Sequence, residues 1–124
     1  MNTSVCPVVY TYDGNTFSAT GFPTDPLTPF KNPFVVYDGS RADPFPSTSF
    51  PEQHLVLRRQ LMASGVLVQE GWDVVFTRDY QFYSPSEAAC IVSGNSRNGL
   101  LAWVSFADGL PLKDYAKTKR RLSG

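Results

Sequence analysis

The sequence predicts a single α+β domain over residues 1–124, built from a small antiparallel sheet of hairpins and two helices. Two strand–turn–strand patterns occur, one near the N-terminus and one after residue 65, and a helical pattern lies on each side of the second. Strands and helices do not alternate regularly, as the βαβ units of a parallel sheet would require. The length of 124 residues suffices for one hydrophobic core without disulfide or metal support.

Residues 1–50 are expected to form a hairpin followed by proline-rich loops. Residues 8–12 are rich in β-branched and aromatic side chains, Asp13-Gly14 is a strong hairpin turn signal, and residues 16–20 form the returning strand. Residues 34–37 predict a short buried strand. The segments around it are too rich in proline for a helix or a central strand.

The next unit, residues 51–112, begins with a helix and a second hairpin. Apolar residues at roughly helical spacing predict a helix over 51–64, which Gly65 ends. Residues 66–68 and 74–77 flank the tight turn Glu70-Gly71, and residues 80–83 extend or follow this hairpin.

The start of the second helix has the pattern of a capping box. Ser84 can accept hydrogen bonds from the free N–H groups, Pro85 suits the first helical position, and Glu87 lies three residues after Ser84. The apolar residues 88–92 continue the helix, and Gly94 ends it.

The C-terminal part is expected to hold a turn, a last strand and a basic tail. Asn98-Gly99 is a turn signal, and residues 100–106 predict the strand. Residues 113–124 form the tail, with five basic side chains and one acidic side chain.

The charge of the chain is zero overall, with eleven basic and eleven acidic side chains, and this excludes a protein that coats nucleic acid or anionic membrane by bulk charge. The charge is unevenly distributed. Residues 1–57 carry two basic and five acidic side chains, net −3, and residues 58–124 carry nine and six, net +3. The second part therefore has room for a local basic face.

Composition also limits the chemistry and the location. One histidine and two cysteines leave few ligands for a metal site, so we expect no metal, no cofactor and no enzyme activity. No apolar run approaches the roughly 18 residues of a membrane span, and the polar residues 1–4 are unlike a signal peptide. We expect a cytoplasmic protein with no membrane partner.

A longer motif occupies residues 82–103. It reads Phe82-Tyr83-Ser84-Pro85-Ser86-Glu87-Ala88-Ala89, then, after four residues, Gly94-Asn95-Ser96-Arg97-Asn98-Gly99-Leu100, with Trp103 beyond. This run resembles the family catalogued as domain of unknown function 4357, and residues 21–24, 34–40 and 57–67 resemble further segments of that family. The resemblance extends over residues 17–112. The motif of residues 82–103 is similar also to that of the restriction-enzyme-adenine-methylase-associated domain.

The resemblance implies a non-catalytic accessory module of a bacterial or phage restriction–modification or nuclease system. Such domains typically follow GIY-YIG nuclease domains, and the related domain has been proposed to read DNA. Nucleic acid, DNA more than RNA, is therefore the expected partner, and a nuclease or methylase is a candidate protein partner. The chain departs from the family pattern at Leu100, where the family has tryptophan, and at Asn95, where it has arginine; Arg97 supplies a nearby charge.

Two sets of residues follow as candidates. The candidate nucleic-acid-binding residues are Ser86, Asn95, Arg97, Arg78, Lys117, Lys119, Arg120 and Arg121. The residues expected to serve the fold as a structural motif are Ser84, Pro85, Glu87, Gly94, Asn98, Gly99 and Trp103.

Several of these features have ordinary structural explanations. The capping box can occupy the N–H groups that a phosphate would need, and Trp72 and Trp103 are more often core residues than base-stacking ones. The basic tail can be a frayed terminus, and Arg58 and Arg59 are expected on a solvated helix face. His54 with Cys6 or Cys90 lacks the other groups that nucleophilic catalysis requires.

The alternative function is a protein–protein module that docks onto a nuclease, a methylase or another host or phage factor. Aromatic side chains in the acidic first fifty residues could supply its binding edge; these are Phe22, Phe30, Phe34, Phe45 and Phe50.

Overall fold

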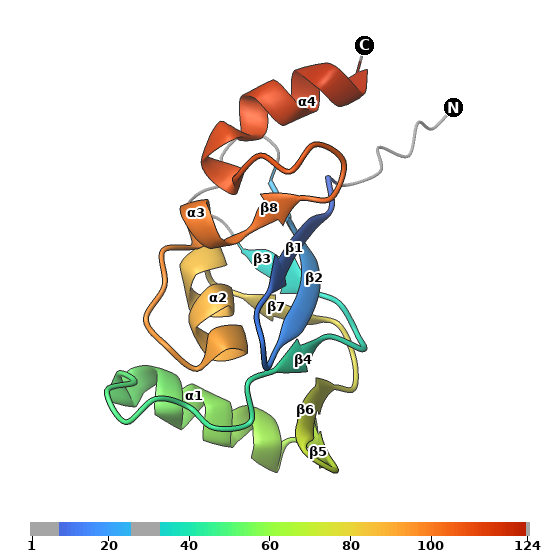
Figure 1. The fold of residues 1–124 in the computed structure, drawn as a ribbon. Helices are drawn as coiled ribbons and strands as arrows, with labels where there is room; N and C mark the ends of the chain where they lie inside the picture. Colours follow the sequence, from blue (N-terminus) through green and yellow to red (C-terminus); the bar gives the residue numbers. More distant parts are fainter. Residues whose placement is uncertain (1–7, 26–32, 124) are drawn as a thin grey trace.

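The computed structural model describes residues 8–25 and 33–123 as an α+β fold (Figure 1). The strands are β1 (Tyr10–Asp13), β2 (Ser18–Pro23), β3 (Phe34–Val36), β4 (Arg41–Ala42), β5 (Leu67–Glu70), β6 (Asp73–Phe76), β7 (Tyr80–Phe82) and β8 (Val104–Ser105). The helices are α1 (Glu52–Ala63), α2 (Pro85–Ser93), α3 (Gly99–Ala102) and α4 (Tyr115–Ser123), and the 3-10 turn η1 (Leu112–Asp114) precedes α4.

All strand pairs are antiparallel, in the order β5-β6-β4-β2-β1-β8, with β3 pairing to β2 and β7. The short strand β4 joins the two hairpins, because Arg41 lies opposite Ser18 of β2 and Val75 of β6. The two local hairpins of the sequence therefore become one sheet through a two-residue strand.

Helix α2 lies against the sheet and contacts β2, β3, β4 and β7. Nearly every residue of α2 is buried, so the helix forms the centre of the core rather than a surface layer. Helix α1 packs on α2 and β5 at one end of the molecule, and α4 lies at the opposite end (Figure 1). The largest fully buried core side chains include Trp103, Tyr10, Phe34, Phe76, Phe82 and Ile91.

The α+β class, both predicted hairpins and both predicted helices are confirmed. Helix α1 occupies Glu52–Ala63, and Gly65 after it has a φ of +82°, the left-handed conformation that favours glycine beyond a helix end. Within the described residues no helix is long and apolar enough to cross a bilayer.

The C-terminal region differs from expectation. The prediction of a strand over residues 100–106 is wrong in its first half, because the side chain of Asn98 caps Leu100 and starts α3; only Val104–Ser105 pair as β8. The basic tail is helix α4 rather than a frayed end, since Tyr115 and Thr118 are buried. The described residues thus form two α-helices, α3 and α4, that the sequence does not predict.

Arg58 does not lie on a solvated face. It is 5% exposed, and its guanidinium donates to the carbonyl oxygens of Ile91 (2.8 Å) and Asp43. The pattern of α1 hides this role because both carbonyl acceptors come from other parts of the chain.

Two aromatic expectations also need correction. Trp103 is fully buried, but Trp72, at the tip of the β5–β6 hairpin, is 81% exposed and belongs to no core. Phe34 and Phe50 are buried, so the proposed N-terminal binding edge is largely unavailable, although Phe45 is exposed. Phe30 lies outside the described residues.

Candidate nucleic-acid interface

Three hydrogen bonds are made by residues of the long motif: one caps the start of α2, and two join α2 to α3 and its C-cap Trp103. The hydroxyl of Ser84 accepts the N–H of Glu87 (3.1 Å), and the hydroxyl of Ser86 accepts the N–H of Gly99 (2.9 Å). The indole N–H of Trp103 donates to the carbonyl oxygen of Pro85 (2.9 Å). We call this set, Ser84, Pro85, Ser86, Gly99 and Trp103, the clasp.

Gly99 serves the clasp through the absence of a side chain. A Cβ at this position would overlap the backbone of Pro85 and Ser86, although the φ of Gly99 is not positive. The requirement is therefore close approach of two backbone segments rather than an unusual conformation. Ser86 has a structural partner in Gly99, and its contact with phosphate stays a prediction.

Glu87 contributes to the N-terminal capping of α2, and Gly94 is its C-cap residue. The carboxylate of Glu87 accepts the N–H of Tyr83 (3.0 Å), one residue before the N-cap. Gly94 has a φ of +72° and donates its N–H to the carbonyl of Cys90 (2.9 Å).

Arg97 lies on the loop between α2 and α3, and its exposed side chain is held in place by hydrogen bonds. Its Nε donates to the hydroxyl of Tyr12 (3.0 Å) on β1, and its NH1 donates to the carbonyl of Ser96 (2.9 Å). Tyr12 in turn packs edge-on against Trp103. A guanidinium has five N–H donors, so this one retains donors for a phosphate or a base edge.

The other candidates of this loop have lesser roles. The backbone of Asn95 exchanges hydrogen bonds with the hydroxyl of Ser93, and the side chain of Asn98 caps α3. Leu100, at the position where the family has tryptophan, is half-buried against the core.

Arg78 lies at the α1 end of the molecule. Its NH2 is 3.3 Å from the carbonyl oxygen of Ser64, just after α1, where a cation favourably meets the helix dipole. Because α4 lies at the opposite end, Arg78 does not share a surface with the basic helix (Figure 1).

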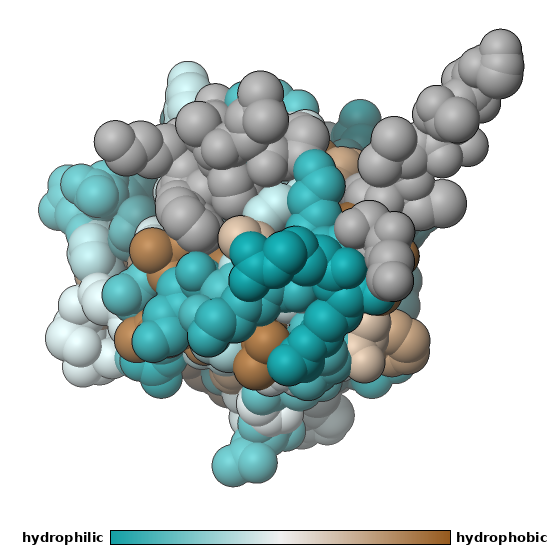
Figure 2. Space-filling view, turned by 90° about the horizontal axis from the view of Figure 1, so that it is seen from above, coloured by the Kyte–Doolittle hydropathy of each residue, from teal (hydrophilic) through white to brown (hydrophobic). Residues whose placement is uncertain are grey.

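Helix α4 brings three of the predicted cations together. Lys117, Arg120 and Arg121 are spaced i, i+3 and i+4, which places them on one helix face, and they line a shallow hollow of about 350 Å³. Figure 2 shows a predominantly hydrophilic surface over this end of the molecule. Lys119 is exposed on another side of the same helix. Of the predicted set, therefore, only the α4 cations gather.

The sequence interpretation missed the residues that hold this helix in place. Thr118 is fully buried, and its hydroxyl donates to Oδ1 of Asp108 (3.3 Å) in the turn after β8. The same oxygen accepts the N–H of Leu110 (3.0 Å), and Oδ2 lies 3.6 Å from NH1 of Arg121. The i, i+3 spacing of Tyr115 and Thr118 is the signal for a buried helix face.

The docking of α4 is expected to depend on the charge of Asp108. Partial desolvation raises the pKa of the Asp108 carboxyl, but Leu110, Thr118 and Arg121 outweigh it and leave the pKa below its ordinary value. The Asp108 carboxylate therefore stabilises the docking of α4 fully above the ordinary carboxyl pKa of about 3.9. This stabilisation is lost as the pH falls through the lower pKa that Asp108 has in the folded state. We expect α4 amides of Asp108→Ala to exchange hydrogen faster at neutral pH.

Hydrogen exchange, corrected for the intrinsic rates at each pH, measures this effect. Acidification well below about pH 4, through the lowered pKa of Asp108 in the folded state, should bring the α4 exchange of the unmodified protein close to that of Asp108→Ala. Asp73→Ala, which removes an exposed carboxylate at the tip of the other hairpin, should leave α4 unchanged. Equal protection of α4 in Asp108→Ala and the unmodified protein would contradict the role of Asp108.

Among the described residues, the thiol of Cys90 and the ring of His54, both weighed for catalysis, have different partners. Burial raises the pKa of the Cys90 thiol, with hydrogen bonding to the Arg97 backbone opposing it, and the ring of His54 packs against Phe50. Cys6 lies outside the described residues. In residues 8–25 and 33–123 no group of three or more histidine, cysteine or acidic side chains could hold a metal ion.

Fold and surface together define a small α+β domain with a basic helix at one end. The family model described as Domain of unknown function (DUF4357) matches residues 12–116, so the chain belongs to this family. No curated protein and no solved structure matches the chain.

Proposed function

We propose that the chain is a non-catalytic accessory module that binds nucleic acid, DNA in preference to RNA, through the basic face of α4. The observation that carries this proposal is the gathering of Lys117, Arg120 and Arg121 on one helix face in a chain of zero net charge. A local cluster of basic side chains on a protein of zero net charge favours binding of nucleic acid at that one surface, rather than nonspecific coating of the nucleic acid by the protein.

The spacing of the cluster suits a phosphate backbone. Lys117 and Arg121 are four residues apart, about 6 Å along the helix axis, and phosphates of one strand repeat about every 3.4 Å along B-DNA. The face can therefore meet about two or three phosphates. Arg121 also lies 3.6 Å from the carboxylate of Asp108, an ion pair that holds the end of α4 to the turn after β8.

The biological setting in this proposal comes from the resemblance. Restriction–modification systems place DNA, a nuclease and a methylase near one another in the bacterial or phage-infected cytoplasm. A module with few phosphate contacts binds weakly by itself, so it fits a role as an addition to a stronger DNA-binding nuclease or methylase.

The proposal predicts a reduced salt dependence when the α4 cations are removed. A fluorescence anisotropy titration of duplex DNA at several salt concentrations gives the slope of log K against log salt, and each phosphate contact contributes about 0.9. Lys117→Ala/Arg120→Ala should weaken binding and lower the magnitude of the slope by about 1.8.

The matched control is Arg41→Ala/Arg59→Ala, which removes the same charge from exposed positions on β4 and α1. It should leave affinity and slope nearly unchanged. Duplex RNA of equal length tests the preference for DNA, and Arg97→Ala tests whether the loop beside Tyr12 takes part. Failure of the unmodified protein to bind any nucleic acid at low salt would overturn the proposal.

A protein partner is the second candidate function, and the exposed Trp72 favours it. This side chain is 81% exposed on the hairpin that contains β5, an edge strand of the sheet. Exposed tryptophans beside a sheet edge are typical of docking surfaces. A pull-down from cell extract treated with nuclease, which removes bridging DNA, separates this function from DNA binding. Trp72→Ala, the matched variant, should lose a protein that the unmodified chain retains.

A further inference from the structure

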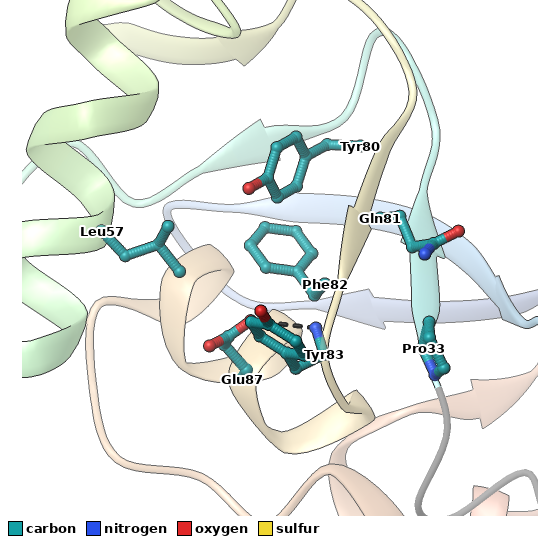
Figure 3. Close-up of a pocket in the computed structure, with 7 residues that line it drawn as sticks. All are labelled: Pro33, Leu57, Tyr80, Gln81, Phe82, Tyr83 and Glu87. Carbon is teal, nitrogen blue, oxygen red and sulfur yellow. Dashed lines mark hydrogen bonds between the residues drawn. The ribbon is translucent and has the colours of Figure 1, made fainter.

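A pocket of about 310 Å³ lies between α1, β7 and the start of α2 (Figure 3). The basic helix α4 lies at the end of the molecule opposite α1 (Figure 1). Leu57 enters it from α1, Tyr80 and Phe82 from β7, and Tyr83 and Glu87 from the start of α2. Pro33 and Gln81 complete the lining. Its size is at the lower end of the range for small-molecule sites, so it suits one small group rather than a large ligand.

The walls of the pocket are mostly aromatic and apolar, with a single carboxylate. Tyr80 and Phe82 pack edge-to-face at 4.7 Å between ring centroids, which fixes the orientation of both rings. Tyr83 is 82% exposed and has no ring partner among the described residues. An exposed tyrosine at the edge of a pocket offers an uncovered π face to a ligand.

The carboxylate of Glu87 is held in the wall of this pocket. Its Oε1 accepts the N–H of Tyr83 (3.0 Å), and Figure 3 shows the two side chains together at one end of the pocket. Within the described part of the chain no lysine, arginine or histidine lies within ion-pair distance of Glu87. The pocket therefore presents a carboxylate that has no cationic side-chain partner among the described residues, beside aromatic rings.

We propose that this pocket binds an organic cation, an alkylammonium or guanidinium group. Aromatic faces attract cations through the ring quadrupole, and a carboxylate adds a direct charge, so both features favour the same kind of ligand. A metal ion does not fit, because one carboxylate among apolar walls offers too few oxygen ligands. The site is separate from the α4 face and does not depend on nucleic-acid binding.

The first test compares cations with a neutral molecule of the same shape. Choline and methylguanidinium are titrated into the full chain, with 3,3-dimethylbutan-1-ol as the neutral isostere of choline, and amide chemical shifts are followed by NMR. We expect shifts at Tyr80, Tyr83 and Glu87 with the cations, and binding of the alcohol about tenfold weaker. Equal binding of the alcohol, or no binding of either cation, would overturn the proposal.

The second test uses Glu87→Gln. Glutamine retains a carbonyl oxygen that can accept the N–H of Tyr83, so the helix start is preserved while the charge is lost. Cation affinity should fall about tenfold, and Glu70→Gln, an equal charge change at the exposed hairpin tip, should have no effect. An unchanged affinity in Glu87→Gln would remove the carboxylate from the site.

A third comparison identifies the source of the cation. A capped peptide with one arginine between glycines is compared with methylguanidinium. Tighter binding of the peptide indicates the basic side chain of a protein partner, and equal binding indicates a free organic cation. Both ligands should lose affinity in Tyr83→Ala, and unchanged binding of both in this variant would overturn the assignment of the site to the pocket.

Discussion

Replacing Trp103 with alanine is expected to lower the free energy of unfolding by about 3–5 kcal/mol. The side chain is fully buried, and its ring lies 4.4 Å from that of Phe34 and 5.7 Å from that of Tyr12, measured between centroids. The alanine variant loses this packing and leaves the carbonyl of Pro85 without the indole N–H that it accepts at 2.9 Å. Urea denaturation followed by far-ultraviolet circular dichroism measures the loss without using tryptophan fluorescence.

Trp72 provides a matched control in the same chain. Because it is 81% exposed, Trp72→Ala should change stability by no more than about 0.5 kcal/mol. The free energy of unfolding of a native protein is usually about 5–15 kcal/mol, so a loss of about 3–5 kcal/mol can leave Trp103→Ala partly unfolded. Trp103→Phe therefore serves as a milder second variant. Phenylalanine keeps much of the apolar area and loses the hydrogen bond. Similar effects at positions 72 and 103 would contradict the central role of the clasp.

The clasp changes how the family motif is interpreted. Ser84, Pro85, Ser86, Gly99 and Trp103 make contacts within the domain, and these contacts account for the spacing between the serine-proline pair, the asparagine-glycine pair and the tryptophan. The proposed contacts to nucleic acid lie elsewhere, on α4. The motif therefore predicts the fold of this chain better than it predicts the ligand.

Elements defined by neighbouring residues were the ones predictable from the sequence. Asp13-Gly14 indicates the first hairpin, and the Ser84-Pro85 pair indicates the start of α2, since turn and cap geometry depends on local chemistry. Strand β4 has two residues and is defined only by its distant partners Ser18, Val74 and Val75. Such a strand leaves no local periodicity to detect.

The C-terminal helix was missed for a related reason. Its sequence is mostly charged, and its place in the fold depends on Tyr115 and Thr118 meeting Tyr10 and Asp108, which precede it in the chain. Once the helix is recognised, the i, i+3, i+4 spacing of Lys117, Arg120 and Arg121 shows that they share a face. The candidate interface was thus predictable as a set of residues but not as a surface.

Replacing Arg58 with alanine is expected to lower the free energy of unfolding by about 2–4 kcal/mol. Its guanidinium donates to the carbonyl of Ile91 in the last turn of α2, where helix carbonyls lack partners within the helix, and to the carbonyl of Asp43 in the loop that packs there. Burial lowers the pKa of Arg58, with the charge of Asp43 opposing this, but an arginine stays protonated at neutral pH. The loss should therefore be the same from about pH 6 to pH 9.

Arg59, the next residue, is exposed and gives the matched control, because Arg59→Ala removes the same charge from the same helix. It should change stability by no more than about 0.5 kcal/mol in the same urea experiment. Arg58→Met separates volume from hydrogen bonding, since methionine fills much of the space but leaves both carbonyls unpaired. Most of the loss should persist in Arg58→Met. Full stability of Arg58→Met would show that Arg58 acts by packing alone. Equal stability of Arg58→Ala and Arg59→Ala would mean that the guanidinium of Arg58 does not hold α1 to α2.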